Sequence, residues 1–243
     1  MKAIILAAGV GSRIRPLTDN CPKCLLKVGG RTILEMMISN IQSCGIKEVV
    51  FVLGYLQDQI RDYVKTNFPD LTVHFVMNDK YTETNTGFSL MLSKNFIGDS
   101  DFIKFDADVV FDKKILKKLI ESEYKTSLCI DKNINLDAEE IKVIIDDQNK
   151  VLKASKIVNP KEAVGESIGI EKISNETAKL LFAELENMMM DEKNYQEYYE
   201  GGYERLIEKN IPFYALDISG LKWTEIDTRE DFIMAEKIFA TVS

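Results

Sequence analysis

Apolar runs alternate with helical patterns through the first half of this 243-residue chain. Four of the runs are typical of buried strands, at 3–6, 48–53, 71–77 and 101–107. Four segments with helical spacing separate or follow them, at 32–41, 56–67, 88–95 and 113–122. Strands that alternate with helices in this way predict a doubly wound, mostly parallel α/β sheet with helices on both faces. Ligands of such sheets bind beyond the carboxyl ends of the strands.

The pattern changes between residues 126 and 173. Strand-like runs at 127–130, 141–145 and 151–154 have no helix between them, which predicts a small antiparallel excursion that walls one side of the cleft. Two helices, a strand and a last helix are expected to follow, at 176–190, 195–209, 213–217 and 230–239. Because no Pro-, Gly- or Ser-rich linker interrupts the chain, we expect residues 1–243 to form a single domain.

The first predicted strand opens into a loop that contains two glycines, Leu6-Ala7-Ala8-Gly9-Val10-Gly11-Ser12-Arg13. Glycine lets the backbone approach a ligand closely and adopt positive φ. The freed amides, together with Ser12, form an anion-binding nest. Arg13 and Lys23 add fixed positive charge for oxygens that gain charge in a transition state. The loop therefore predicts binding of nucleotide phosphates.

Two commoner glycine loops are excluded. A P-loop needs the string G-x-x-x-x-G-K-[ST], which does not occur in this sequence. The dinucleotide fingerprint needs a third glycine where this chain has Ile14. It also needs an acidic residue about 20 positions further on, where this chain has Gly29-Gly30-Arg31.

Composition narrows the class of partner. A net charge of -8 argues against a nucleic-acid-binding surface, which would need a basic face. No apolar run approaches the roughly 18 residues that span a bilayer. The apolar stretch after Met1 is also too short for a signal peptide. We therefore expect a cytoplasmic protein that has neither nucleic acid nor membrane as a partner.

The tetrapeptide Cys21-Pro22-Lys23-Cys24 has the C-x-x-C spacing of redox and zinc sites. The sequence holds no second such pair and only one histidine, His74, so four zinc ligands are hard to assemble. We interpret Pro22-Lys23 as the working part of this tetrapeptide and expect no redox or metal function from the cysteines.

The glycine loop extends into a longer string, G-x-G-S-R-x-x-P-x-T-x-x-x-P-K, which runs from Gly9 to Lys23. This string resembles the signature of the sugar-phosphate nucleotidyltransferase superfamily, and the chain is similar to its small phosphocholine cytidylyltransferase group. The resemblance covers nearly all of the chain and includes segments at 78–81, 85–90, 106–111, 165–170 and 219–228. It implies a Rossmann-like nucleotidyltransferase fold.

Two carboxylates stand two residues apart at the end of the strand predicted at 101–107, at Asp106 and Asp108. Side chains with this spacing on a strand share a face. Carboxylates beside a triphosphate loop suggest Mg²⁺, which prefers oxygen ligands. The resemblance implies that Asp108 and Asp227 are the metal ligands, with Asp106 holding a metal-bound water or lying behind them. The alternative is that these acids are solvated or cap a helix.

The resemblance implies that an acceptor phosphate or phosphonate attacks the α-phosphorus of a nucleoside triphosphate and that pyrophosphate leaves. Such a monoester is already largely ionised near neutral pH, because its second pKa is about 6, so no general base is needed. Mg²⁺ would bridge the two substrates. Lys23 would contact the α-phosphate and the incoming phosphate. Arg13 and the amides near Gly11 and Ser12 would hold the β- and γ-phosphates.

The nucleotide base is expected to lie against a wall of mostly small residues, Leu6, Ala7, Ala8 and Gly9. Asn78 and Asn85 are candidates for hydrogen bonds to the base edge, because an amide both donates and accepts. Asparagine is equally a turn residue. Gly87 and Ser89 match family positions beside the base and ribose. The expected preference for CTP comes from the resemblance alone.

The acceptor is expected to be a small phosphorylated or phosphonylated amino alcohol, such as phosphocholine. Recognition of a quaternary ammonium uses an aromatic cage. The second half of the chain supplies acidic and aromatic candidates, at Glu166, Tyr199, Trp223 and Glu225. Tyr195, Tyr198 and Tyr199 have helical spacing, so packing is expected to explain at least two of them. A sugar-1-phosphate acceptor is the alternative. A nucleotide sensor without turnover is disfavoured, because all four cationic and metal residues are present.

Overall fold

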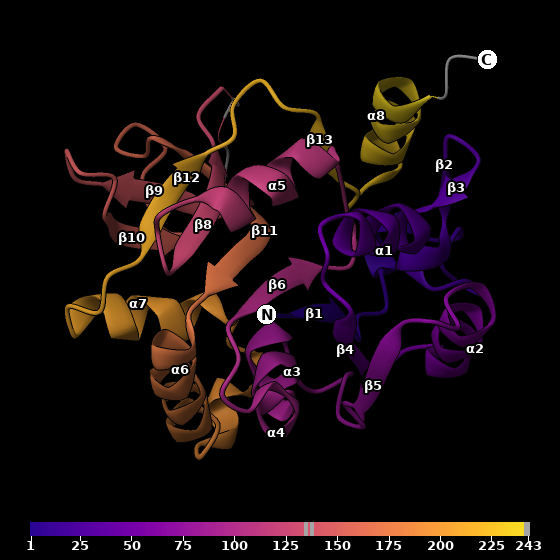
Figure 1. The fold of residues 1–243 in the computed structure, drawn as a ribbon, viewed down its shortest axis with the longest axis horizontal. Coiled ribbons are helices and arrows are strands. Elements are labelled where there is room, and N and C mark those ends of the chain that lie inside the picture. Colours follow the sequence, from indigo (N-terminus) through magenta and orange to yellow (C-terminus); the bar gives the residue numbers. More distant parts are fainter. Residues whose placement is uncertain (134–135, 137–138, 241–243) are drawn as a thin grey trace.

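The computed structural model describes residues 1–133, 136 and 139–240, and its largest element is a nine-stranded mixed sheet (Figure 1). Four parallel strands form its centre, β1 (Lys2–Ala7), β4 (Glu48–Leu53), β5 (Thr72–Met77) and β6 (Phe102–Asp106). They lie in the order β6-β1-β4-β5. The predicted parallel centre is therefore confirmed.

Helices cover both faces of the sheet. One face packs against α1 (Ile33–Ser43), α2 (Gln57–Asn67) and α5 (Lys113–Glu121). The other packs against α3 (Thr86–Leu92), α4 (Lys94–Ile97), α6 (Asn175–Met188) and α7 (Glu200–Glu208). Successive residues of β1 enter the two cores alternately, Ala3 and Ile5 on the first side and Ile4 and Leu6 on the second. This is the doubly wound arrangement that the alternating pattern predicts.

The antiparallel excursion continues the central sheet. It contains β8 (Ser127–Asp131), β9 (Lys142–Ile145), β10 (Val151–Ser155) and β11 (Gly165–Ile173). β11 pairs antiparallel with β6 on one side and with β8 and β9 on the other. A further strand, β12 (Tyr214–Asp217), lies parallel to β8. Because β11 was not among the expected strands, the direct link from the excursion to the sheet centre is a finding of the structure.

Two short sheets complete the region beyond β6. β2 (Lys27–Val28) pairs with β3 (Arg31–Thr32), and β7 (Val109–Phe111) pairs antiparallel with β13 (Trp223–Glu225). The register sets Glu225 opposite Val109, and the amide of Ile226 donates to the carbonyl of Asp108 over 3.2 Å. A third apolar core lies here, under α8 (Arg229–Phe239). The β7–β13 pairing therefore carries acidic residues from the end of the chain to the end of β6.

The helix predicted at 195–209 is wrong in its first part. A short 3-10 helix spans Glu192–Gln196, and α7 begins only at Glu200. The carbonyls of Tyr195 and Glu197 accept hydrogen bonds from the amides of Asn85 (2.7 Å) and Gly87 (3.2 Å), at the start of α3. The first amides of a helix have no partner within it, so this segment serves as their acceptor instead of continuing as a helix.

A helix needs about 20 consecutive, mostly apolar residues to cross a bilayer. No helix within residues 1–133, 136 and 139–240 is long and apolar enough to do so.

Candidate active site

The glycine loop lies beyond the carboxyl end of β1 and walls a cavity of about 350 Å³. Gly11 adopts the left-handed conformation, with φ of 64°, and a Cβ there would lie 3.2 Å from Thr18 and 3.3 Å from Lys23. Glycine is therefore favoured by both conformation and space. The cavity lining includes most of the predicted nucleotide and metal residues, Leu6, Ala7, Gly9, Gly11, Ser12, Arg13, Lys23, Asn85, Asp108 and Asp227.

Lys23 lies between the two predicted metal ligands. Its Nζ is 2.7 Å from Asp108 Oδ2 and 2.6 Å from Asp227 Oδ1. Burial by itself would lower the pKa of this ammonium, but the two carboxylates outweigh burial and hold its pKa above the usual range. Arg13 reaches the same cluster, with Nη2 at 2.6 Å from Asp227 Oδ2. Both predicted cations are thus gathered at one carboxylate centre.

Three carboxylates come close enough together to hold a metal ion. One oxygen from each of Asp108, Glu225 and Asp227 lies within 4.8 Å of the other two. Asp108 Oδ1 is buried and has no hydrogen-bond partner within the described structure. Burial, followed by Asp108 and Asp227, raises the pKa of Glu225. A set of carboxylate oxygens with an orphaned buried atom suits a divalent cation. Glu225, expected at the acceptor, lines the larger cavity and also lies beside the two carboxylates predicted to bind metal.

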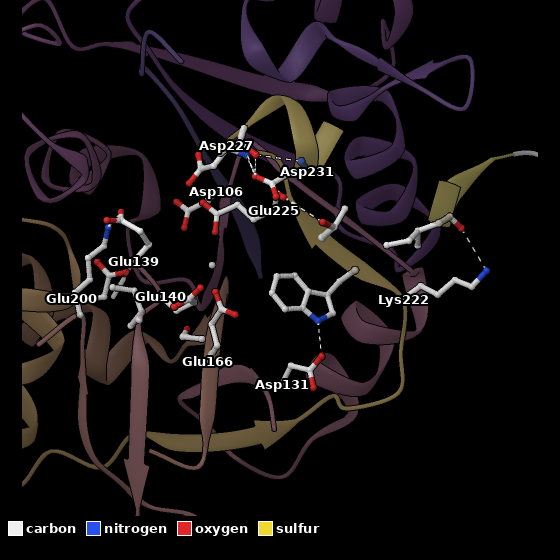
Figure 2. Close-up of a pocket in the computed structure, with 18 of the residues that line it drawn as sticks. Asp106, Asp131, Glu139, Glu140, Glu166, Glu200, Lys222, Glu225, Asp227 and Asp231 are labelled. Atoms are coloured by element: carbon white, nitrogen blue, oxygen red, sulfur yellow. Dashed lines mark hydrogen bonds and ion pairs between the residues drawn. The ribbon is translucent and has the colours of Figure 1, made fainter. Parts of the chain in front are cut away.

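A second cavity, of about 790 Å³, adjoins the first. Figure 2 shows acidic side chains from several elements around it, including Asp106 on β6, Glu166 on β11, Glu200 on α7 and Glu225 on β13. Three residues line both cavities, Arg13, Tyr198 and Asp227. The carboxylate centre therefore stands at the junction of two compartments, which is the arrangement needed to join two substrates.

Asp106 is fixed from behind by a buried network. Its Oδ2 accepts hydrogen bonds from Lys104 Nζ (2.8 Å) and from the hydroxyl of Tyr199 (2.7 Å). Gly169 has φ of 73°, and a Cβ there would lie 2.5 Å from the same oxygen, so only glycine leaves room for this carboxylate. Burial raises the pKa of Asp106, and the nearby Lys104 ammonium partly opposes that rise. Asp106 is therefore held by protein groups, and its place behind the predicted metal ligands stays a prediction.

Two of the predicted base-binding residues form a buried structural network. The side-chain amide of Asn78 donates to Thr84 Oγ1 (2.9 Å) and to Ser89 Oγ (3.0 Å). Its carbonyl oxygen accepts from the amide of Lys80 over 3.1 Å. Within the described residues, neither Asn78 nor Ser89 lines the smaller cavity. For Asn78, the turn interpretation is the one that these contacts support.

Among the described residues, Gly87 and Ala8 do not line the smaller cavity either. A Cβ on Gly87 would lie 2.8 Å from the carbonyl oxygen of Glu197, so its small size permits the close packing of that segment on α3. The carbonyl of Ala8 accepts from the amide of Tyr55 over 3.1 Å. Asn85 does line the cavity, and its side chain caps α3 by accepting from the amide of Thr86.

The predicted acceptor residues all line the larger cavity, but they differ in burial and in the contacts that they already make. Glu166 is buried at the junction of β11 and β8, opposite Asp131 in register. Trp223 donates its Nε1 hydrogen to Asp131 Oδ2 over 2.8 Å. Tyr199 is buried, and Lys104 Nζ lies 3.6 Å from the centre of its ring. The Tyr199 ring is therefore already in contact with a cation of the protein.

Sequence reasoning did not single out Lys104, Glu171 and Glu200, which surround Tyr199 and Asp106. Lys104 is fully buried and pairs with Glu171 Oε2 at 2.9 Å, from the neighbouring strand. Burial is the first cause that raises the pKa of Glu171 to about 8 and of Glu200 to about 7. A lysine inside the apolar run 102–105 is the sequence signal that a buried partner is needed, although it does not say which one.

The cysteines of the tetrapeptide are free thiols. Cys24 lies in the core, and burial raises the pKa of its thiol to about 12. Burial also raises the pKa of Cys21. Both shifts favour the thiol over the reactive thiolate, which supports the interpretation that Pro22-Lys23 is the working part.

Comparisons with known proteins agree with this geometry. A family model described as nucleotidyl transferase matches residues 2–240. A CTP:phosphoglutamine cytidylyltransferase of Campylobacter jejuni is 31% identical over 95% of this chain and 97% of its own length. A choline-phosphate cytidylyltransferase of Streptococcus pneumoniae is 39% identical over 51% of this chain and 52% of its own. The solved structure of the CTP:phosphocholine cytidylyltransferase of Streptococcus pneumoniae matches with a TM-score of 0.81 and 27% identity over 98% of both chains. The chain therefore belongs to the nucleotidyl transferase family and is an enzyme of that class.

Proposed function

We propose that this protein is a magnesium-dependent cytidylyltransferase that transfers CMP from CTP to a small phosphorylated or phosphonylated amino alcohol and releases pyrophosphate. The observation that carries the proposal is the junction of the two cavities, where Arg13 and Asp227 border both and Asp108 and Glu225 stand beside them. The names of the relatives support cytidine as the base and a small phosphorylated molecule as the acceptor.

The nucleotide side binds CTP through the glycine loop. The amides near Gly11 and Ser12, with Arg13, hold the β- and γ-phosphates, and the small residues at 6–9 support the base. Lys23 lies next to the carboxylate centre and stabilises the charge that develops on the α-phosphate oxygens during attack. The acceptor oxygen is already ionised, so the chain supplies position and charge rather than a base.

Asp108 and Asp227 would hold Mg²⁺, with Glu225 adding a third oxygen nearby. When bound, the ion offsets the repulsion between the phosphates of the two substrates. Lys23 bonds Asp108 and Asp227, and Arg13 bonds Asp227, so both cations are within reach of phosphates that gather at the centre.

The acceptor side is suited to a molecule with one anionic and one cationic end. Arg13 lies at the junction, and Lys156 lines the same cavity with its Nζ at 3.6 Å from Glu139. These two cations are the candidates for contacts to the acceptor phosphate. Away from the junction, Glu166 and Glu200 present carboxylates to the cavity, which favours a positive head group.

We also propose that residues 1–243 act as one nucleotidyltransferase domain, with residues 126–173 as its acceptor-side subregion. The pairing of β11 with β6 supports this, because it makes the subregion part of the central sheet. The proposed partners are CTP and a small phosphorylated molecule, without nucleic acid or membrane. With CTP as the substrate, the proposed location of the reaction is the cytoplasm.

The test is pyrophosphate release across CTP, UTP, GTP and dTTP, each with phosphocholine, aminoethylphosphonate and glucose-1-phosphate, in Mg²⁺ and again in EDTA. We expect turnover with CTP and an amine-bearing acceptor, and none in EDTA. Efficient turnover of glucose-1-phosphate would instead favour the second candidate, a sugar-1-phosphate nucleotidyltransferase. Undiminished turnover in EDTA would remove the metal from the proposal.

A further inference from the structure

One carboxylate oxygen of the acceptor cavity is buried without a hydrogen-bond partner, while the same side chain also interacts with Tyr199. Glu200 begins α7, is 8% exposed and lines the larger cavity. Its Oε2 is buried and has no hydrogen-bond partner within the described structure. A buried carboxylate oxygen without a donor is destabilising. The cavity therefore lacks a hydrogen-bond donor at this position.

The aromatic faces beside this carboxylate are already in contact with cations of the protein. Lys104 Nζ lies 3.6 Å from the centre of the Tyr199 ring. Lys156 Nζ lies 5.0 Å from the centre of the Tyr198 ring. Trp223 is the remaining aromatic residue in the described lining of the larger cavity. Within the described residues it has no such cation contact, and its Nε1 donates to Asp131. Each of the two tyrosine rings therefore already has a cation of the protein over one face.

Behind the cavity floor, three carboxyl groups lie near one ammonium, that of Lys104. Lys104 is the cation paired with Asp106 (2.8 Å) and Glu171 (2.9 Å), and Glu200 is a third buried carboxylate of the same neighbourhood. Burial and the nearby Asp106 raise the pKa of Glu200 to about 7, while Lys104 opposes that rise. A second cation that donates a hydrogen bond would satisfy both the charge and the orphaned oxygen.

The two kinds of ammonium differ in what they need from a protein. A quaternary ammonium has no N–H group and is recognised through open aromatic faces. A primary ammonium has three N–H donors and forms charge-assisted hydrogen bonds to carboxylates. The described cavity offers buried carboxylate oxygen and few open rings, so it fits the second kind.

We propose that the acceptor carries a primary ammonium, which donates to Glu200, and that this contact makes the enzyme discriminate against quaternary ammonium acceptors. This inference rests on the proposed function and narrows its acceptor class. Lys104 has a positioning role, because its ammonium contacts the Tyr199 ring and holds Asp106 on the cavity floor.

The test uses four acceptors that differ only at nitrogen: phosphoethanolamine, its N-methyl and N,N-dimethyl derivatives, and phosphocholine. Pyrophosphate release with CTP is measured for each. We expect kcat/KM to fall at least about tenfold from the first to the last, the effect of one charged hydrogen bond. Thermal stabilisation of the protein by each compound, measured with CTP present, gives the same ranking without turnover. A phosphocholine value equal to or above that of phosphoethanolamine would overturn the inference.

Glu200→Gln supplies a second measurement, because it keeps the shape and removes the charge. We expect KM for phosphoethanolamine to rise about tenfold, KM for CTP to change less than twofold, and the preference for the primary amine to disappear. Glu208→Gln, an exposed position on the same helix, is the matched control and should leave all values unchanged. A preference that survives in Glu200→Gln would contradict the assignment of Glu200. The wild-type methylation series decides the question if this variant does not fold.

The experiments distinguish a failure of the cytidylyltransferase proposal from a failure of the primary-ammonium inference. If all four amines react with CTP at similar rates, the cytidylyltransferase proposal stands and the primary-ammonium inference fails. If none of the four reacts or stabilises the protein while glucose-1-phosphate does, the proposed function fails first and the inference falls with it.

Discussion

The nucleotide-side cavity and the acceptor-side cavity are assembled in opposite ways. The nucleotide side takes most of its lining from one continuous segment, residues 6–13, and from the turn at 22–24. The acceptor side takes side chains from β6, β8, β11, α7, β13 and α8. A phosphate group can be held by the backbone amides of a single turn, whereas an organic head group needs side chains from several directions.

The two cavities meet at the carboxylate centre. Asp227 and Arg13 line both, and Lys23 bonds Asp108 and Asp227 from the nucleotide side. A change at this junction should therefore disable the reaction as a whole. A change in the acceptor wall should affect one substrate and leave the other. The predictions below test that division, from the largest expected effect to the smallest.

Asp108→Asn should lower metal-dependent turnover by about three orders of magnitude or more, because it removes a proposed metal ligand at the junction. Pyrophosphate release measures the loss, and calorimetric titration should still detect weak CTP binding. Asp112→Asn is the control, since Asp112 caps α5 and asparagine caps a helix equally well. An Asp108→Asn variant with near-normal turnover would remove the shared centre from the mechanism.

Lys23→Ala should lower kcat by about two to three orders of magnitude and leave the fold intact, as expected for the loss of one preorganised charge donor. Steady-state kinetics and the circular dichroism spectrum check the two parts. Lys27→Ala, four residues later and exposed, should change neither. Retention of more than a third of the wild-type kcat would exclude Lys23 from the chemistry.

Lys104→Met should destabilise the protein by about 3 kcal/mol, because it leaves the buried Glu171 and the partly buried Asp106 without their cation. Urea unfolding measures the change in free energy. The double variant Lys104→Met with Glu171→Gln should recover part of the loss, since it removes one of the orphaned charges. A loss below about 1 kcal/mol in the single variant would show that the network behind the acceptor wall carries little stability.

Trp223→Ala should raise KM for a cationic acceptor about tenfold and change KM for CTP less than twofold. A cation–π contact of about 1 kcal/mol is lost, and Asp131 loses its indole partner. Trp223→Phe separates the two causes, because it keeps an aromatic face and removes the Nε1 donor. Equal increases in both KM values would mean that the acceptor wall is not specific to one substrate.

Cys21→Ser with Cys24→Ala should leave turnover within about twofold of wild type, because the thiols lie outside the proposed chemistry. The alanine should cost about 1 kcal/mol of stability, since Cys24 is part of the core. Metal analysis by mass spectrometry completes the test. Zinc that copurifies with the wild type and disappears from the variant would give these cysteines the metal role that we do not assign them.

The amino-acid sequence alone determines the parallel centre of the sheet and the nucleotide loop. Both depend on short-range features: apolar runs, helical spacing, and two glycines followed by Ser12 and Arg13. β4 spans Glu48–Leu53 as expected, and α8 begins within one residue of its expected start. The glycine loop needs only a local turn, so Lys23 and Arg13 could be assigned to the nucleotide side before any tertiary contact was known.

Which side chains line the acceptor-side cavity depends on the tertiary structure. The β7–β13 pairing brings Glu225 to Asp108. The segment before α7 is not α-helical because its carbonyls accept hydrogen bonds from Asn85 and Gly87, more than 100 residues away in sequence. The position of Lys104 in an apolar run predicts a buried charge, but the sequence does not indicate which carboxylates pair with it. Local patterns extend over a few residues, whereas the neutralisation of a buried ammonium depends on which distant carboxylates the fold brings within hydrogen-bond distance.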